Sequence, residues 1–149
     1  MKILNRENVI TNNQISAFIK LLGNNYQPRE LIIYERKIDL LRYLIKSIVV
    51  LPLLLMILLN KLEGLYLPIF DKVYIFVFAQ NDDGNDKHSK QLYSLHALAH
   101  ELRHKWQREC NKKSSEKDAD DFATNFINSN SSQISEIMNW EDEWEVGEE

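Results

Sequence analysis

Three residues in the second half of the chain have the types and the spacing to hold and use a metal ion. His100, Glu101 and His104 form the pattern H-E-x-x-H. Residues four apart lie on one face of an α-helix, so both imidazoles can bind a single ion. Glu101 is rotated by about 100° from His100, which places its carboxylate beside the ion. The pattern predicts a zinc hydrolase in which Glu101 is the general base that takes a proton from water.

The residues around this pattern predict the helix that such chemistry requires. Apolar side chains recur at spacings of three and four residues, at Leu92, Leu95, Leu98, Ala99 and Leu102. That period is typical of an amphipathic helix with one buried face. His96 extends the row of histidines by a further turn. We interpret His96 as a partly buried histidine bonded to the backbone, with an accessory ligand or a substrate contact as the alternatives.

A catalytic zinc ion normally has three protein ligands and one open position, so a further ligand is expected downstream. Ser115 is a good N-cap, and a second helical stripe follows it at Ala119, Phe122, Ala123, Phe126 and Ile127. The two helices would form an antiparallel hairpin through a short polar turn. The second helix offers carboxylates at Glu116, Asp118, Asp120 and Asp121. In a symmetric hairpin, Asp118 or Asp120 would reach the height of His104.

The two segments together resemble a known family. H-E-L-R-H followed by E-K-D-A-D-D-F-A is similar to the gluzincin metallopeptidases, especially the small ImmA/IrrE-like enzymes of mobile elements and phages. The resemblance covers residues 92–128 and is weak elsewhere. It implies that Glu116 is the third zinc ligand, that Asp120 orients a ligand histidine from the second shell, and that Asp118 holds a variable position. Only twelve positions separate His104 from Glu116, fewer than is usual in the family, so Asp118 and Asp120 remain alternative ligands.

Composition places the chain among ordinary globular proteins. Its 149 residues are enough for one domain, so we expect a single zincin-like domain over 1–149. A net charge of −4 argues against non-specific nucleic-acid binding, which needs a basic surface. Cys110 is the single cysteine, which excludes an intramolecular disulfide and fits a reducing, cytoplasmic setting. The N-terminal residues are too polar for a secretory signal.

The residues that precede the pattern predict an α+β fold, mostly helical, with a small sheet next to the H-E-x-x-H helix and an antiparallel helix that supplies the third ligand. Thr11 or Asn12 can cap a short helix that Gly23 ends. Residues 31–34 are a strand or the start of a helix. Residues 73–78 have the strongest β-branched and aromatic content. The resemblance implies that this strand is the sheet edge that pairs with substrate, and a central core strand is the alternative.

A continuously apolar run, 48–59, is the segment that most resembles a membrane span. It is shorter than the roughly 20 residues that a span needs and is broken by Pro52. A buried helix pair divided near Pro52 is the preferred interpretation. A membrane-associated hairpin or an exposed partner-binding surface are the alternatives.

The C-terminal segment 139–149 is acidic and contains Trp140 and Trp144. A charged tail of this kind is usually solvated, so we expect it to be mobile. The tryptophans raise three alternatives. They dock the tail on the body, they anchor a partner, or the tail occupies the active-site cleft as an autoinhibitor.

These observations predict a zinc-dependent metalloendopeptidase that cleaves a protein substrate with Glu101 as base. The family resemblance implies that the substrate is a transcriptional repressor or another regulator of the same genetic element. One alternative is a non-catalytic zinc-binding regulatory or interaction protein on a zincin scaffold. Another is a membrane-peripheral protein anchored by residues 48–59. The sequence identifies neither the cleavage site nor the oligomeric state.

Overall fold

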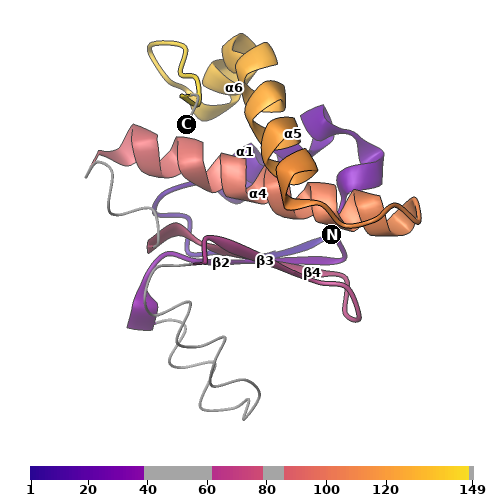
Figure 1. Cartoon of the computed structure of the whole chain (residues 1–149). Coiled ribbons are helices and arrows are strands. Elements are labelled where there is room, and N and C mark those ends of the chain that lie inside the picture. Colours follow the sequence, from indigo (N-terminus) through magenta and orange to yellow (C-terminus); the bar gives the residue numbers. More distant parts are fainter. Residues whose placement is uncertain (39–61, 79–85, 148–149) are drawn as a thin grey trace.

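A computed structural model describes residues 1–38, 62–78 and 86–147 (Figure 1). In chain order the elements are β1 (Lys2–Leu4), α1 (Asn12–Leu22), the 3-10 helix η1 (Asn24–Tyr26), β2 (Glu30–Tyr34), β3 (Gly64–Leu67), β4 (Lys72–Phe76), α4 (Lys87–Glu109), α5 (Glu116–Ser129) and α6 (Ser131–Met138). This part of the chain is α+β, as expected. The apolar run 48–59 lies outside the described residues. Among the helices that are described, none has the length and the apolar character needed to cross a membrane.

The strands form one mixed sheet in the order β1-β2-β4-β3. β1, β2 and β4 are parallel, and β3 runs antiparallel to β4. Residues 31–34, which could begin a helix or form a strand, lie in β2. β4 lies between two neighbours, so the central-strand interpretation of residues 73–78 is confirmed and the edge-strand interpretation is wrong. The sheet edge beside the predicted site is β3, which the sequence analysis did not identify.

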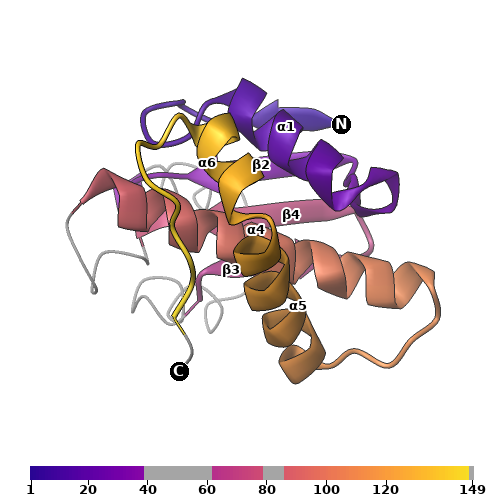
Figure 2. The same cartoon turned by 90° about the horizontal axis from the view of Figure 1, so that it is seen from above.

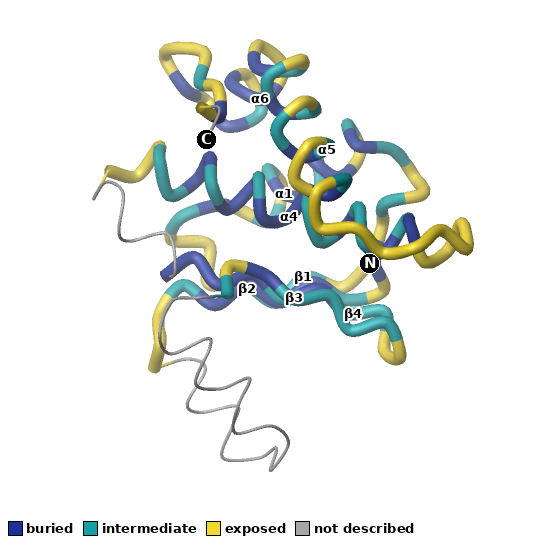
Figure 3. The backbone as a smooth tube through the Cα atoms, viewed as in Figure 1, coloured by how far each residue is buried: buried dark blue, intermediate teal, exposed yellow. Residues whose placement is uncertain are grey.

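Helices α1, α4, α5 and α6 lie on one side of this sheet, and α4 runs lengthwise across it (Figures 1 and 2). The predicted apolar stripe of α4 faces the core, where Leu95, Leu98 and Leu102 are at most 2 % exposed. Burial of one such leucine contributes about 2 kcal/mol to stability. Phe18 of α1 and Val73 of the sheet complete the same buried layer, which Figure 3 shows along the inner side of α4. The core therefore fixes which face of α4 remains free for chemistry.

The caps of α1 agree with the sequence prediction. The Thr11 hydroxyl accepts from the backbone N–H of Gln14, and the Gln14 side chain accepts from the N–H of Thr11, which makes a capping box. Gly23 ends the helix at a φ of 111°, a conformation that a side chain would disfavour. α1 then leads through η1, which brings Tyr26 toward α4.

The connection from α4 to α5 is not a symmetric hairpin. Asn111, at a φ of 52°, reverses the chain, and the N–H of Lys112 bonds the carbonyl of Gln107 at 2.7 Å. The chain then returns beside the last turns of α4, so that Ser115 lies next to Gln107. α5 therefore begins at the level of His104. It runs back across α4 at a steep inclination (Figure 2).

The acidic tail, expected to be mobile, packs on the body as far as Val146. Trp140 is buried, and its indole N–H donates to the side-chain oxygen of Gln91 at 2.8 Å. The amide of Asn128 bonds both the N–H and the C=O of Val146, at 2.8 and 3.0 Å. Docking, one of the three alternatives for the tryptophans, is therefore what the structure shows. The autoinhibitory alternative is not, because the residues that line the cleft described below are all outside the tail.

Candidate metal centre

The two histidines of the pattern and one carboxylate of α5 meet at a single point. Nε2 of His100 lies 3.0 Å from Nε2 of His104. Oε2 of Glu116 lies 3.2 Å from Nε2 of His104 and 3.3 Å from Nε2 of His100. The described residues thus contain a group that can hold a metal ion, composed of His100, His104 and Glu116. Glu116 supplies this carboxylate because α5 begins level with His104.

The contact of His100 with Asp120 determines the tautomer of the imidazole, and so which nitrogen presents a lone pair to the cluster. Nδ1 of His100 lies 2.6 Å from Oδ1 of Asp120. An ionised carboxylate only accepts hydrogen bonds, so Nδ1 carries the hydrogen and donates to Asp120. Nε2 then presents a lone pair to His104 and Glu116. Asp120 therefore lies behind the ring of His100 and orients it, at the position where the family resemblance expects a residue that orients a ligand histidine.

The ring nitrogen of His104 that faces away from the cluster is also hydrogen-bonded. Its Nδ1 lies 3.1 Å from the amide oxygen of Gln107 and 3.2 Å from the hydroxyl oxygen of Ser114. With the hydrogen on Nδ1, the Nε2 of His104 likewise directs a lone pair into the cluster.

Three electron-pair donors therefore converge with no hydrogen between them, an arrangement that is unfavourable unless a cation lies among them. The separations also fit an ion. Ligand atoms held about 2.0–2.2 Å from one tetrahedral zinc ion are roughly 3.3–3.5 Å apart. The observed distances of 3.0, 3.2 and 3.3 Å are close to that spacing. Two imidazole nitrogens and one carboxylate oxygen are also a donor set that zinc accepts.

Glu101 lies beside the cluster and not in it. Its carboxylate accepts a hydrogen bond from the backbone N–H of Tyr66 in β3. Burial raises the pKa of Glu101 above its ordinary value, and the neighbouring His100 and His104 oppose that rise. A carboxyl group in such surroundings can both accept and return a proton more readily near neutral pH.

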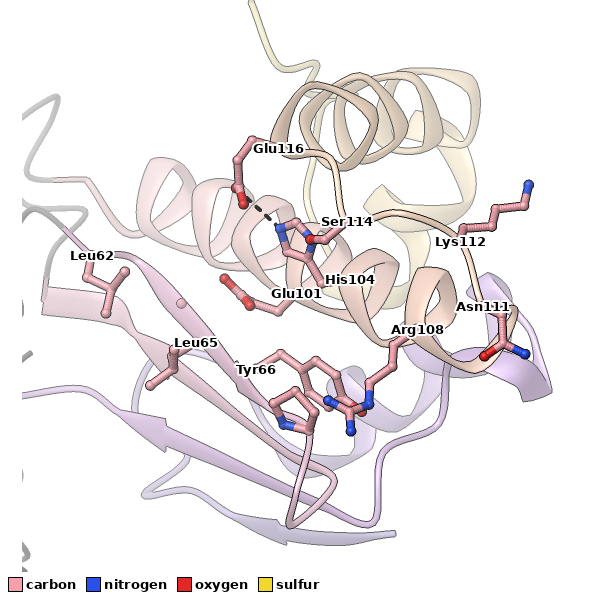
Figure 4. A pocket seen from close by; sticks show the side chains of 12 residues that line it. Leu62, Leu65, Tyr66, Glu101, His104, Arg108, Asn111, Lys112, Ser114 and Glu116 are labelled. Atoms are coloured by element: carbon pink, nitrogen blue, oxygen red, sulfur yellow. Dashed lines mark hydrogen bonds and ion pairs between the residues drawn. The ribbon is translucent and has the colours of Figure 1, made fainter. Parts of the chain in front are cut away.

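An open cavity of about 650 Å³ gives access to these groups. Its lining comes from β3 and the residues around it, from α4, and from the connection to α5: Leu62, Gly64, Leu65, Tyr66, Pro68, Glu101, His104, Arg108, Asn111, Lys112, Ser114 and Glu116. Figure 4 shows Glu101 pointing toward β3, with Glu116 above His104 and Tyr66 beside Arg108. A substrate in this cavity would lie between the helix and the edge strand.

Among the described strands, β3 has a neighbour only on the side of β4, and its other edge carries backbone groups directed toward this cavity. The N–H of Phe76 bonds the C=O of Glu63 at 2.8 Å, which makes these two residues a hydrogen-bonded pair. In an antiparallel pair such residues alternate with others whose groups point outward. The register therefore directs the backbone groups of Gly64 and Tyr66 to the free edge. The Tyr66 N–H is the one that Glu101 uses.

Gly64 is a site residue that the sequence analysis missed. A Cβ on Gly64 would lie 2.6 Å from Cγ of Glu101 and 2.9 Å from its Oε1, closer than non-bonded atoms approach. Only glycine lets the base lie flat against the edge strand. The strand that carries Gly64 is four residues long, which is too short for a periodic pattern in the sequence to reveal it.

One turn away on the same two helices lies a second cluster, formed by Arg103, Gln107 and Asp118. Arg103 donates from Nε and Nη2 to the two oxygens of Asp118, at 2.7 and 3.1 Å, and from Nη1 to the hydroxyl of Tyr26 at 3.2 Å. The Arg103 guanidinium, followed by the Gln107 amide, lowers the pKa of Asp118 to about 2. The guanidinium also lies over the ring of Trp106, 4.0 Å from its centre.

This second cluster bears on Asp118, which was an alternative ligand. Asp118 does not join His100, His104 and Glu116, because its carboxylate is bonded to Arg103 and Gln107. Arg103 joins α4 to α5 and η1. Ser115 caps α5 without a reciprocal capping box. Its hydroxyl accepts from the N–H of Asp118, but its own N–H donates to Gln107.

His96 does not join the ligands. Its Nε2 lies 3.0 Å from the hydroxyl oxygen of Thr124 in α5, so the side chain bridges the two helices. The expectation of a partly buried histidine is confirmed, but this partner is a side chain and not the backbone. His96, His100 and His104 thus meet α5 at successive levels, and only the last two approach a common point with Glu116.

Comparisons of the chain with protein-family models, with curated proteins and with solved structures gave no match.

Proposed function

We propose that this protein is a zinc-dependent metallopeptidase with a zincin-like arrangement, in which His100, His104 and Glu116 hold the ion and Glu101 is the general base. One observation carries the proposal: three lone pairs converge at the wall of an open cavity, with a partly buried carboxylate beside them. A structural zinc site is normally closed by four protein ligands, whereas three ligands leave a position for water.

A zinc ion at this point would supply a Lewis acid that polarises a peptide carbonyl and lowers the pKa of water. The remaining work belongs to the chain. Glu101 takes a proton from the attacking water and returns it to the leaving amine. Its contact with the Tyr66 N–H holds the carboxylate beside the cluster and prevents it from becoming a fourth ligand.

The substrate side of the proposal rests on β3. An extended peptide can add to an open sheet edge through main-chain hydrogen bonds, which hold it without reading its sequence. Gly64 offers its N–H and C=O along the cavity, and Tyr66 offers its C=O, because the Tyr66 N–H is used by Glu101. Arg108 lies two turns after His100 and one turn after His104, on the same face of α4, and lines the far end. Its guanidinium favours an acidic substrate side chain at that end.

The non-catalytic alternative was motivated by the small size of the chain and by the tail tryptophans as anchors for a partner. The position of Trp140 does not favour the second of these motives. In the structure Trp140 is buried and its N–H is bonded to Gln91, so it is not available to a partner in this arrangement.

A matched pair of proteins tests the proposal. The zinc-loaded chain and Glu101→Gln are incubated with a proteome-derived peptide library, and cleavage is followed by mass spectrometry. We expect cleavage by the parent protein that a chelator stops, and a rate about 10²–10⁴-fold lower for Glu101→Gln with zinc content unchanged. Equal rates for the two proteins would exclude Glu101 as the base. A parent protein that binds zinc without cleaving any peptide would favour the non-catalytic alternative.

A further inference from the structure

Gln107 is a buried amide at the junction of the two helices. It is 2 % exposed, and all four of its hydrogen-bonding positions are used. Its Nε2 donates to the carboxylate of Asp118 at 2.7 Å and to the backbone C=O of Ser115 at 3.2 Å. Its Oε1 accepts from the backbone N–H of Ser115 at 3.3 Å and lies 3.1 Å from Nδ1 of His104.

These partners fix the orientation of the amide. A carboxylate and a backbone carbonyl only accept, so the NH₂ group must face Asp118 and the C=O of Ser115. A backbone N–H only donates, so the oxygen must face the N–H of Ser115. Rotating the amide by 180° would place its oxygen against the two acceptors and its NH₂ group against the N–H of Ser115. Each buried polar group left without a partner in this way costs about 1–3 kcal/mol.

The fixed oxygen in turn determines the tautomer of His104. Because Oε1 of Gln107 can only accept, Nδ1 of His104 must carry the hydrogen. Nε2 is then the nitrogen with the lone pair, and it is the nitrogen that points to His100 and Glu116. Ser114 cannot set this choice, because its exposed hydroxyl can donate to Nδ1 or accept from it equally well.

Gln107 also controls where α5 starts. It bonds both backbone groups of Ser115, which is the N-cap of α5 and immediately precedes Glu116. The same amide therefore fixes the ring of one member of the cluster and the backbone next to another. His100 has no such link, because its rear partner Asp120 lies within α5 and bonds only the ring.

We propose that Gln107 is a positioning residue that selects the metal-binding tautomer of His104 and holds Glu116 at the same level. The part of this inference that concerns metal rests on the proposed function. The part that concerns the tautomer does not, so the two can be tested separately.

The tautomer is tested on the full-length, metal-free chain labelled with ¹⁵N. Long-range ¹H–¹⁵N spectra distinguish Nδ1–H, Nε2–H and doubly protonated imidazoles. We expect Nδ1–H for His104 in the parent protein and in Ser114→Ala. In Gln107→Met, which has a similar shape and no amide oxygen, the hydrogen moves to Nε2 and donates to Glu116. Retention of Nδ1–H in Gln107→Met would overturn the proposal.

Zinc affinity is the second measurement, by competition with a coloured chelator. We expect Gln107→Met to weaken zinc binding by about 10–100-fold, the usual effect of removing a group that orients a metal ligand. The matched control is Asp118→Asn, which weakens the same helix junction through Arg103 but leaves the acceptor for His104 in place. An equal loss of affinity in both variants would show that Gln107 acts only through helix packing, and the proposal would fail.

A rescue variant covers the case in which Gln107→Met does not fold. Gln107→Glu combined with Asp118→Asn exchanges the donor and the acceptor between these positions and keeps an oxygen facing His104, while the bond to the C=O of Ser115 is lost. We expect this pair to retain Nδ1–H at His104 and zinc affinity close to that of the parent protein. An Nε2–H tautomer in the folded double variant would contradict the proposal. A parent protein that shows Nδ1–H but binds no zinc would instead refute the proposed function alone.

Discussion

The contact between α4 and α5 contains two polar clusters one turn apart, built from similar residue types. In the first, His100, His104 and Glu116 present three acceptors to one another. In the second, Arg103 and Gln107 donate hydrogen bonds to the carboxylate of Asp118, so donors face acceptors. The second needs nothing more for its stability. The first, with the tautomers assigned above, sets lone pairs against one another and becomes favourable when a metal ion or a proton lies among them.

The difference shows how a binding site can be separated from a structural ion pair without a bound ligand. Both clusters contain carboxylates near nitrogen groups, and composition alone would not distinguish them. The hydrogen-bond partners do, because they fix which nitrogens carry hydrogens. A cation site is indicated where several nitrogen and oxygen lone pairs meet and no neighbouring group can donate a hydrogen bond to them.

The largest expected difference between the two clusters is seen when one carboxylate in each is replaced by the corresponding amide. Glu116→Gln removes a charged ligand, and we expect zinc affinity to fall by more than about 100-fold, beyond the effect of a residue behind a ligand. Asp118→Asn makes the same chemical change in the second cluster and should alter zinc affinity only slightly. Titration with a competing chelator measures both. A larger loss in Asp118→Asn than in Glu116→Gln would reverse our assignment of the two clusters.

A third variant touches neither cluster. Gly64→Ala places a Cβ 2.6 Å from Cγ of Glu101, so the base must move. We expect kcat to fall by about 10–100-fold through this displacement, with zinc affinity unchanged. Gly147→Ala is the matched control, because nothing lies within 4 Å of its added Cβ. Full activity in Gly64→Ala would mean that the position of Glu101 against β3 is not needed.

The smallest effect is on stability and depends on pH. Asp118 has a folded pKa of about 2 against an ordinary value of 3.8, so its contribution is complete above pH 3.8 and is lost as the pH falls toward 2. Because its side chain is 46 % exposed, solvent screening limits this contribution to about 1 kcal/mol. Denaturant unfolding of the metal-free parent and of Asp118→Asn should differ by that amount at neutral pH. The difference should disappear near pH 2, and a difference that grows in acid would contradict the assignment.

Local periodicity was enough to predict the parts of the site that lie within one helix. The spacing of His100 and His104 placed two imidazoles on one face, and Ser115 was identified as the start of the next helix. The choice of Glu116 came from the family resemblance, because the symmetric hairpin favoured Asp118 or Asp120. That geometric argument failed at the connection, where Asn111 turns the chain back along α4 before α5 begins.

The parts that could not be predicted depend on contacts between distant segments. β3 is four residues long, and it becomes a strand because β4 is beside it. Gln107 looked like an ordinary polar residue of a helix, and only the return of Ser115 to its side gives it four partners. The tail was expected to be mobile from its charge, but Trp140 and Val146 provide enough apolar surface to dock it.

The central claim is that His100, His104 and Glu116 form one three-ligand site for a divalent cation. The most direct test is zinc X-ray absorption on the full-length chain loaded with one equivalent of zinc. We predict two imidazole nitrogens and low-coordinate oxygen ligands at about 2.0–2.2 Å, with loss of one imidazole in His104→Ala and loss of the carboxylate in Glu116→Gln. Failure to bind one equivalent of zinc, or a coordination shell unchanged in both variants, would contradict the claim.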